Sequence, residues 1–175
     1  MKGSFLADYI RITGENKISF WGFIKNFIKL HQVRYLYFFR NKSTKISKIL
    51  LKRFKLKYGL EIYSNEIGPG LYIGHAFNIT INEQATLGKN CNIHKGVTIG
   101  QENRGIRKGA PTIGNQVWIG VNSTIVGNIK IGDNVLIAPN SYVNCDVPSN
   151  SIVFGNPCII KHKDNATESY IKNIL

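Results

Sequence analysis

The sequence predicts an all-β solenoid, built as a parallel β-helix of six-residue repeats, that follows an α-helical segment. Two observations predict this fold. In the later part of the chain an aliphatic residue returns every six positions, and the first third is basic, aromatic and spaced like amphipathic helices. The chain has 175 residues, of which 43% are hydrophobic, and this suits one domain with a complete core.

The six-residue period holds for thirteen aliphatic positions, with one two-residue slip after Ile79 and one interruption after Ile99. A glycine often follows the aliphatic residue directly, and a small or β-branched residue stands four positions after it. This period is neither helical nor simply alternating, and it is the signature of a hexapeptide β-helix. The positions are Ile67, Ile73, Ile79, Ile81, Leu87, Ile93, Ile99, Ile113, Ile119, Ile125, Ile131, Ile137 and Val143.

Each hexapeptide is expected to form one short strand and one turn. Three of them make a coil of about 18 residues, and coils stack about 4.8 Å apart, as strands do in a sheet. The aliphatic residues should point inward. The glycines and asparagines of the repeats should serve the turns, where a positive φ is often needed.

Residues 1–58 form a separate segment by composition. Residues 1–60 hold 14 basic and 2 acidic residues, a net charge of +12, whereas residues 61–175 hold 9 and 8. Apolar residues at helical spacing predict two amphipathic helices, over 19–40 and 43–58. Ser43 is the expected N-cap of the second helix and Gly59 its C-cap.

The two helices can cover the open first coil of the solenoid, as terminal caps do. Their charge also suits an anionic partner: a membrane surface, nucleic acid or an acidic polysaccharide. Lysines beside large aromatic residues are typical of interfacial helices, and no nucleic-acid recognition motif is present. We therefore expect peripheral contact with an anionic membrane through residues 1–58, at the cytoplasmic leaflet, and no nucleic acid.

The cysteines and the N-terminus predict a cytoplasmic protein. Three cysteines without C-x-x-C spacing indicate neither a disulfide framework nor a zinc site. Charged residues interrupt the first stretch, MKGSFLADYIRITGEN, where a signal peptide would need an unbroken apolar core. No run approaches the roughly 18 apolar residues of a membrane span.

Residues 59–160 resemble the hexapeptide-repeat acetyltransferases. The segments GPGLYIGHAFNITINEQATLGKNCNIHKGVTIG, APTIGNQVWIGVNSTIVGNIKIGDNVLIAPNSYV and VPSNSIVFGNPCII carry the likeness. They are similar to the serine acetyltransferase branch, and within it to the smaller acetyltransferases of surface-polysaccharide gene clusters. The resemblance implies a left-handed β-helix, although parallel crossovers in general are right-handed. Residues 161–175 would form a C-terminal tail.

The resemblance implies that His75 is the general base. It stands two residues after Ile73, at the family's position for the catalytic histidine. Imidazole suits the task, because the proton of an alcohol must be removed as the alcohol attacks the thioester. A carboxylate should orient this histidine, and Glu61 aligns with the family's aspartate after one deletion. Glu66 is the competing carboxylate.

The same resemblance argues against serine as the acceptor. The interruption, residues 101–112, would be an extruded loop of the same length as in the serine enzymes. Those enzymes place an Arg-His pair where this chain has Gly109 and Ala110, and an Asp where it has Gly74. These charged groups hold a zwitterion, and a neutral saccharide hydroxyl does not need them.

Two further residues, His94 and Lys95, should lie one coil away from His75. Because of the two-residue slip, the residue that stacks on position 75 in the next coil is position 95. Either His94 or Lys95 could contact acceptor or cofactor. A metal-binding histidine triad is not expected, because only His75 and His94 lie on the coils.

Acetyl-CoA is the donor that the resemblance implies, bound in the cleft between adjacent β-helices of a homotrimer. A lysine after the G-N-P segment, Lys161 or Lys163, could meet a phosphate. The residues expected to contact the cofactor are Gly100, Gly120, Val121, Leu136, Ala138 and Lys161.

The sequence therefore predicts an acetyl-CoA-dependent O-acetyltransferase acting on a sugar hydroxyl of a surface polysaccharide or its precursor. Two alternatives stay open. One is a serine O-acetyltransferase of cysteine biosynthesis. The other is a non-catalytic scaffold that kept the fold, for which replacing His75 by alanine would change nothing measurable.

Overall fold

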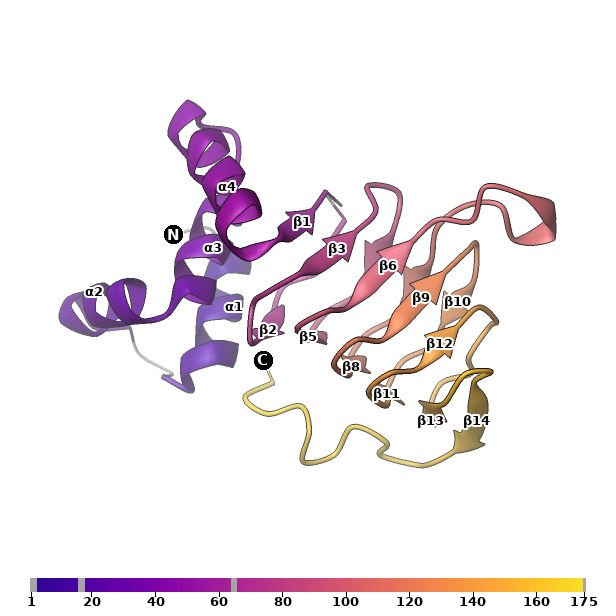
Figure 1. Cartoon of the computed structure of the whole chain (residues 1–175). Helices are drawn as coiled ribbons and strands as arrows, with labels where there is room; N and C mark the ends of the chain where they lie inside the picture. Colours follow the sequence, from indigo (N-terminus) through magenta and orange to yellow (C-terminus); the bar gives the residue numbers. More distant parts are fainter. Residues whose placement is uncertain (1–2, 16–17, 64–65, 175) are drawn as a thin grey trace.

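A computed structural model describes residues 3–15, 18–63 and 66–174 of the chain (Figure 1). Four helices come first and fourteen strands follow within this part. The helices are α1 (Gly3–Thr13), α2 (Phe20–Lys29), α3 (His31–Arg40) and α4 (Lys45–Tyr58). The strands are β1 (Leu60–Ile62), β2 (Tyr72–Gly74), β3 (Ile79–Ile81), β4 (Thr86–Leu87), β5 (Asn92–His94), β6 (Thr98–Gly100), β7 (Thr112–Ile113), β8 (Trp118–Ile119), β9 (Thr124–Val126), β10 (Lys130–Ile131), β11 (Val135–Ile137), β12 (Tyr142–Val143), β13 (Ser151–Phe154) and β14 (Ile159–His162).

The helical segment differs from its prediction in three ways. The predicted helix over 19–40 is two helices, because Leu30 between them has extended backbone angles. Helix α1 was not predicted. The N-cap of α4 is Thr44 rather than Ser43, since the Thr44 hydroxyl accepts a hydrogen bond from the Ser47 N–H at 3.1 Å. The C-cap is Gly59, as expected, with a left-handed φ of 63°.

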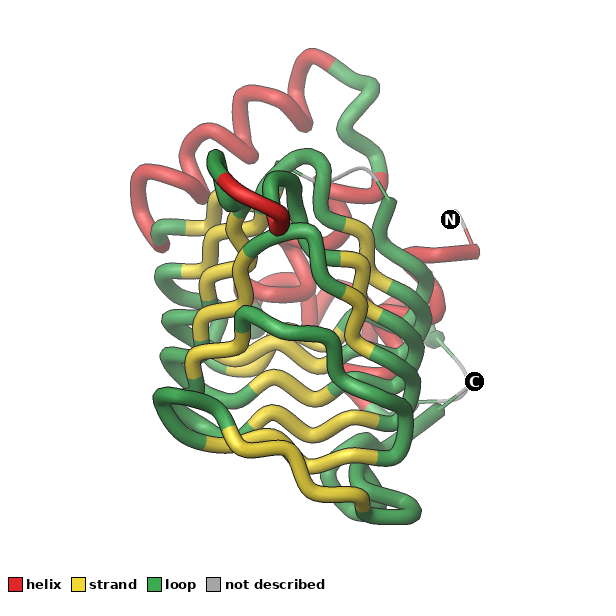
Figure 2. Tube along the Cα trace, turned by 90° about the vertical axis from the view of Figure 1, so that its right-hand side faces the viewer, coloured by secondary structure: helices red, strands yellow, loops and turns green. Residues whose placement is uncertain are grey.

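The predicted parallel β-helix is confirmed. Its coils stack into three parallel sheets, and Figure 2 shows the successive turns lying one on another. We name the sheets by their first strands in chain order: the β1 sheet (β1-β3-β6-β9-β12), the β2 sheet (β2-β5-β8-β11-β13-β14) and the β4 sheet (β4-β7-β10). Tyr72 pairs with Asn92 where the period slips, whereas Trp118 pairs with Leu136, one regular coil of 18 residues later.

The interior of the solenoid is the column of aliphatic residues that the period predicts. All thirteen are at most 6% exposed. Asparagines take the positive φ angles of the corners, for example Asn122 at 58° and Asn134 at 53°. The repeat glycines do something else. A Cβ on Gly88 would lie 2.6 Å from the carbonyl oxygen of Gly114 on the next coil, so glycine there permits close stacking.

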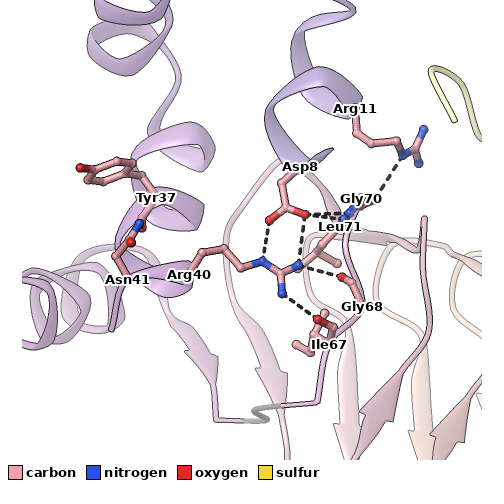
Figure 3. A network of polar contacts seen from close by, with 9 residues as sticks. All are labelled: Asp8, Arg11, Tyr37, Arg40, Asn41, Ile67, Gly68, Gly70 and Leu71. Atoms are coloured by element: carbon pink, nitrogen blue, oxygen red, sulfur yellow. Dashed lines mark hydrogen bonds and ion pairs between the residues drawn. The ribbon is translucent and has the colours of Figure 1, made fainter. Parts of the chain in front are cut away.

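A buried ion pair between Asp8 and Arg40 links the helices to the segment that leads into β2 (Figure 3). Asp8 of α1 accepts hydrogen bonds from the guanidinium of Arg40 of α3, with Nε at 2.7 Å and Nη2 at 3.1 Å. It also accepts from the backbone N–H groups of Gly70 and Leu71, at 2.9 and 2.8 Å. The Asp8 side chain is 0% exposed and that of Arg40 is 9% exposed. One carboxylate therefore joins two helices to the first coil.

Two segments leave the regular coils. The segment between β6 and β7, residues 101–111, projects from the solenoid and carries a short 3-10 helix, Gly105–Arg107 (Figure 1). Backbone hydrogen bonds between Glu102 and Gly109 close its base. Thr112, the last residue of the predicted loop, belongs to β7 and pairs with Thr86. Strand β14 pairs antiparallel with β13 and so runs two residues past the predicted boundary at 160. The chain after β14 then returns past the β2 sheet toward the helices (Figure 1).

Candidate functional site

His75 lies at the corner where the chain leaves β2 and turns toward β3. Its backbone has a positive φ of 50°, and its side chain is exposed. The Phe77 N–H donates to the His75 carbonyl at 2.7 Å, which closes a tight turn. Other corners of the coils have the same backbone conformation, for example Gln116 at 53° and Asn122 at 58°, so the angle places His75 at a coil corner. The turn presents an imidazole to solvent, as a general base requires.

His31 of α3 contacts this turn, a contact that was not predicted from the sequence. Its Nε2 lies 3.2 Å from the carbonyl oxygen of Ala76, so the Nε2–H tautomer can donate a hydrogen bond to it. The ring stacks on Tyr58 at 4.7 Å between centroids and meets Phe77 at 5.2 Å. Burial lowers the pKa of His31. The helical segment thus supports the turn that carries His75.

His94 lies on the neighbouring coil, beside the same turn. It pairs in register with Gly74, so Lys95 stands one coil from His75 as the slip in the period predicts. A Cβ on Gly74 would come 2.5 Å from Nδ1 of His94. The imidazole therefore fills the space that a side chain at position 74 would need.

His94 is half-buried, whereas Lys95 is exposed. The centroid of the His94 ring lies 4.8 Å from that of Trp118 and 6.3 Å from that of Tyr72. Burial, followed by the nearby charge of His75, lowers the pKa of His94. Its Nε2 is buried without a hydrogen-bond partner among the described residues.

Glu61 of β1 has partners other than His75. Its Oε2 accepts from the Tyr63 hydroxyl at 2.9 Å, and its Oε1 lies 3.4 Å from Nζ of Lys55. Within the described ranges, no hydrogen bond or ion pair joins Glu61 to His75. The orienting role of Glu61 stays a prediction.

The residues expected to contact the cofactor fall in two places. Most lie on or beside the β2 sheet, where Gly120 is next to Ala138 on the following coil and Val121 follows Gly120. Leu136 pairs with Trp118 and with Ile152, and Ile152 pairs in turn with Lys161. Lys161 is exposed, with its Nζ 5.7 Å from the Phe154 ring centroid. Gly100 is separate, at the end of β6 in the β1 sheet.

The described residues contain no group of three or more His, Cys, Asp or Glu side chains placed to hold a metal ion. The thiols of Cys145 and Cys158 lie 3.6 Å apart, and Cys91 is buried. Burial raises the pKa of Cys91 to about 11.

Comparison with known proteins finds similarity to acetyltransferases built from hexapeptide repeats. Residues 110–145 match the family of bacterial transferase hexapeptide (six repeats). A serine acetyltransferase of Synechococcus elongatus is 35% identical over 128 residues, which is 73% of this chain and 52% of that protein. A serine acetyltransferase of Staphylococcus aureus is 41% identical over 107 residues, which is 61% of this chain and 50% of that protein. The chain spans about half the length of these curated relatives.

Solved structures of serine acetyltransferases have the same fold. The soybean apoenzyme superimposes with a TM-score of 0.67 and 28% identity over 90% of this chain and 67% of that one. The enzyme from Brucella abortus in complex with coenzyme A gives a TM-score of 0.65 and 27% identity, over 92% of this chain and 66% of that one. The predicted left-handed β-helix is confirmed by this similarity.

These relatives correct one prediction. The expectation of a surface-polysaccharide acceptor is wrong, because the proteins similar to this chain in sequence and in structure are serine acetyltransferases and none of those named above points to a polysaccharide. The absence of charged side chains at positions 74, 109 and 110 did not justify a change of acceptor class. The chain is thus a homologue of the serine acetyltransferases, and its residues 110–145 carry the repeats of the bacterial hexapeptide transferases.

Proposed function

We propose that this chain is an acetyl-CoA-dependent O-acetyltransferase whose acceptor is L-serine. The observation that carries the proposal is His75, which stands exposed on a tight turn at the position that the family resemblance gives to the general base. The likeness of nine-tenths of the chain, helices included, to solved serine acetyltransferases supports the donor and the acceptor.

His75 removes the proton of the serine hydroxyl as the oxygen attacks the acetyl carbonyl. The new C–O bond forms, the C–S bond of the thioester breaks, and His75 returns the proton to the departing thiolate, so that O-acetylserine and CoA leave. Imidazole exchanges protons near neutral pH and can serve both steps. A backbone N–H near the turn would stabilise the oxyanion. This direct transfer needs no acyl-enzyme.

The acceptor must be held by groups other than those found in the serine enzymes. Gly74 has His94 against it, and a Cβ on Gly109 would come 3.1 Å from that of Asn128, so neither site has room for a larger side chain without movement. We propose that His94 and Lys95, on the coil beside His75, supply acceptor contacts in their place. Glu61 would orient His75 after release from Lys55 and Tyr63.

Acetyl-CoA would lie along the β2 sheet in a cleft between two copies of a homotrimer. The backbone of the later coils faces this cleft in the proposal, from Gly120 and Val121 to Leu136 and Ala138, and Lys161 would meet a phosphate. Gly100, in the β1 sheet, would serve a neighbouring copy. Trimer formation is thus part of the proposed mechanism, because it would bring the two groups of residues together.

The helical segment would also contact an anionic membrane surface. Helix α2 has no buried residue, and Phe20, Trp21 and Ile28 are 69%, 78% and 67% exposed. Lys25 and Lys29 of the same helix are exposed as well. Exposed aromatic residues beside lysines are typical of helices that lie in the interface. No helix in the described ranges has the length and apolar content needed to cross a bilayer.

The proposal is tested by the release of CoA thiol from acetyl-CoA with L-serine, for wild type, His75→Ala and His162→Ala. His162 has a 69% exposed side chain outside the proposed site and is the matched control. We expect wild type and His162→Ala to release thiol, and His75→Ala to be slower by about 10²–10⁴-fold. Equal rates in all three, or no serine-dependent release by a folded wild type, would reject the proposal; the second outcome would favour the scaffold.

A further inference from the structure

A small cavity lies on the outer side of the β2 sheet, beneath the C-terminal tail. Its volume is about 280 Å³, close to the lower end of typical ligand pockets, which range from about 300 to 1,000 Å³. Side chains from α1, from three adjacent strands and from the tail form its wall. The residues that carry the argument are Arg11, Asn92, His94, Trp118, Tyr170 and Lys172.

Arg11 brings a buried positive charge to this cavity. The residue is 3% exposed, and its Nε donates to the Gly70 carbonyl at 3.2 Å. Its Nη2 donates to Oδ1 of Asn92. Nη1 makes no hydrogen bond in the described part of the chain, and no carboxylate there forms an ion pair with the guanidinium.

Arg11 is not a member of the neighbouring ion pair. Figure 3 shows it directed away from Asp8 and Arg40, toward the C-terminal tail. The carboxylate of Asp8 is already taken up by Arg40 and by two backbone N–H groups. Burial lowers the pKa of Arg11, and the charge of Asp8 opposes this shift without a direct ion pair. Buried charges in proteins are normally paired in direct contact, so a guanidinium without such a contact at a cavity wall favours a ligand of opposite charge.

His94 supplies the second polar group. Its Nε2 is buried and has no partner among the described residues, and buried ring nitrogens normally have one. Because Nδ1 lies against Gly74, Nε2 is the ring nitrogen available to the cavity. In the Nε2–H tautomer it donates a hydrogen bond, which an anionic oxygen would accept.

The C-terminal tail lines one side of the cavity, where Tyr170 packs against Trp118. The Tyr170 ring lies 5.2 Å from that of Trp118 in an edge-to-face arrangement, and Nδ2 of Asn92 donates to the Tyr170 carbonyl at 3.3 Å. Nδ2 of Asn173 donates to the Arg11 carbonyl at 3.5 Å. Lys172 adds a third basic group at the edge. Among the described residues, none of those that line the cavity is acidic.

We infer that this cavity binds a small monocarboxylate, the size of a hydroxy acid or an amino acid, through the Arg11 guanidinium and Nε2 of His94. A guanidinium donates to carboxylate oxygens with charge-assisted hydrogen bonds, and the aromatic wall accepts a short carbon skeleton. Binding in this cavity needs no acetyl-CoA and does not rest on the proposed function, although His94 is also a proposed acceptor contact and lies beside the turn of His75.

Trp118 provides the readout, because it lines the cavity and the chain's other tryptophan, Trp21, is 78% exposed. In the Trp21→Phe background, the fluorescence of Trp118 is titrated with lactate and with lactamide at constant ionic strength. We expect a saturable change with lactate and none with the neutral lactamide. Equal responses to the two compounds, or no response to lactate, would overturn the inference.

Variants in the same background locate the site. Arg11→Gln should weaken lactate binding by at least about tenfold, since a hydrogen bond to a charged group is lost. His94→Leu should also weaken lactate binding. It provides a second test of the cavity if Arg11→Gln does not fold. Lys163→Gln, on the exposed part of the tail and outside the cavity, should leave lactate binding unchanged and is the control. Unchanged affinity in both folded cavity variants, Arg11→Gln and His94→Leu, would contradict the assignment.

Discussion

Gly74 and His94 occupy one space on two adjacent coils: a Cβ on Gly74 would come 2.5 Å from Nδ1 of His94 and 2.6 Å from its Cε1. The two residues are direct partners in the register of β2 and β5. The imidazole cannot move freely, because Trp118 and Tyr72 lie on either side of it. Glycine at position 74 is therefore a condition for histidine at position 94, beside the proposed catalytic turn.

Gly74→Ala should destabilise the protein by about 1–3 kcal/mol, because an added methyl group overpacks the contact with His94. Gly74→Ala combined with His94→Ala should recover most of the loss that Gly74→Ala causes alone. The measurement is the free energy of unfolding in urea for the two single variants and the double variant, treated as a double-mutant cycle.

Gly100→Ala is the matched control for that cycle. Gly100 ends a strand of the β1 sheet, and a Cβ there would meet Val126 at an ordinary 3.4 Å. Its replacement should change the free energy of unfolding by no more than about 0.5 kcal/mol. Additive effects of Gly74→Ala and His94→Ala would show that the two side chains do not compete for space.

The buried pair of Asp8 and Arg40 should contribute strongly to stability. Asp8→Ala leaves the Arg40 guanidinium buried without its carboxylate and should cost about 3–5 kcal/mol in the free energy of unfolding. Asp164, whose side chain is 85% exposed, provides the control, since Asp164→Ala should cost less than about 0.5 kcal/mol. Similar losses in the two variants, measured in urea, would mean that the Asp8 network does not hold the helices in place.

The period of six residues sufficed to predict the solenoid, because burial in a β-helix repeats within each coil. Whether Ile93 or Ile119 points inward depends on its place in its own hexapeptide, and both are fully buried. The slip after Ile79 was enough to place His94 and Lys95 one coil from His75. The general-base assignment of His75 came from the family resemblance instead and stays a prediction, although the turn and its exposure suit it.

The contacts of the helical segment could not be predicted in this way. His31 reaches Ala76, and Arg11 reaches Asn92, across 45 and 81 positions of sequence. No repeat relates these residues, and their helical spacing says only which face of a helix is apolar. The break at Leu30 was missed for the same reason, because packing of two short helices rather than local sequence decides it.

Stability should fall as the pH is lowered from 7 to 5, through His31 and His94. Burial lowers the pKa of both in the folded state, so the unfolded chain, with histidines near pH 6.5, takes up protons first as the pH falls. The two histidines therefore contribute fully to the free energy of unfolding above about pH 6.5, and this contribution is lost as the pH falls from there toward their lower pKa in the folded state. His31→Gln with His94→Gln should flatten the pH dependence of the free energy of unfolding between pH 5 and 7, and His162→Gln should leave it unchanged. A slope that survives in the double variant would assign it to other groups.

Helix α2 should bind anionic vesicles at low salt. It presents Phe20 and Trp21 together with Lys25 and Lys29 to solvent, and each lysine near an anionic surface contributes about 1 kcal/mol. Lys25→Gln with Lys29→Gln should therefore weaken co-sedimentation with such vesicles by about tenfold or more, and added salt should have the same effect. Trp21→Ser should weaken it too, whereas Ile106→Ser should not, although Ile106 at the tip of the projecting loop is 98% exposed. If Ile106→Ser and Trp21→Ser act alike, general hydrophobicity rather than α2 directs the protein to lipid. If wild type fails to co-sediment at low salt, the charge of the helical segment serves a partner other than a membrane.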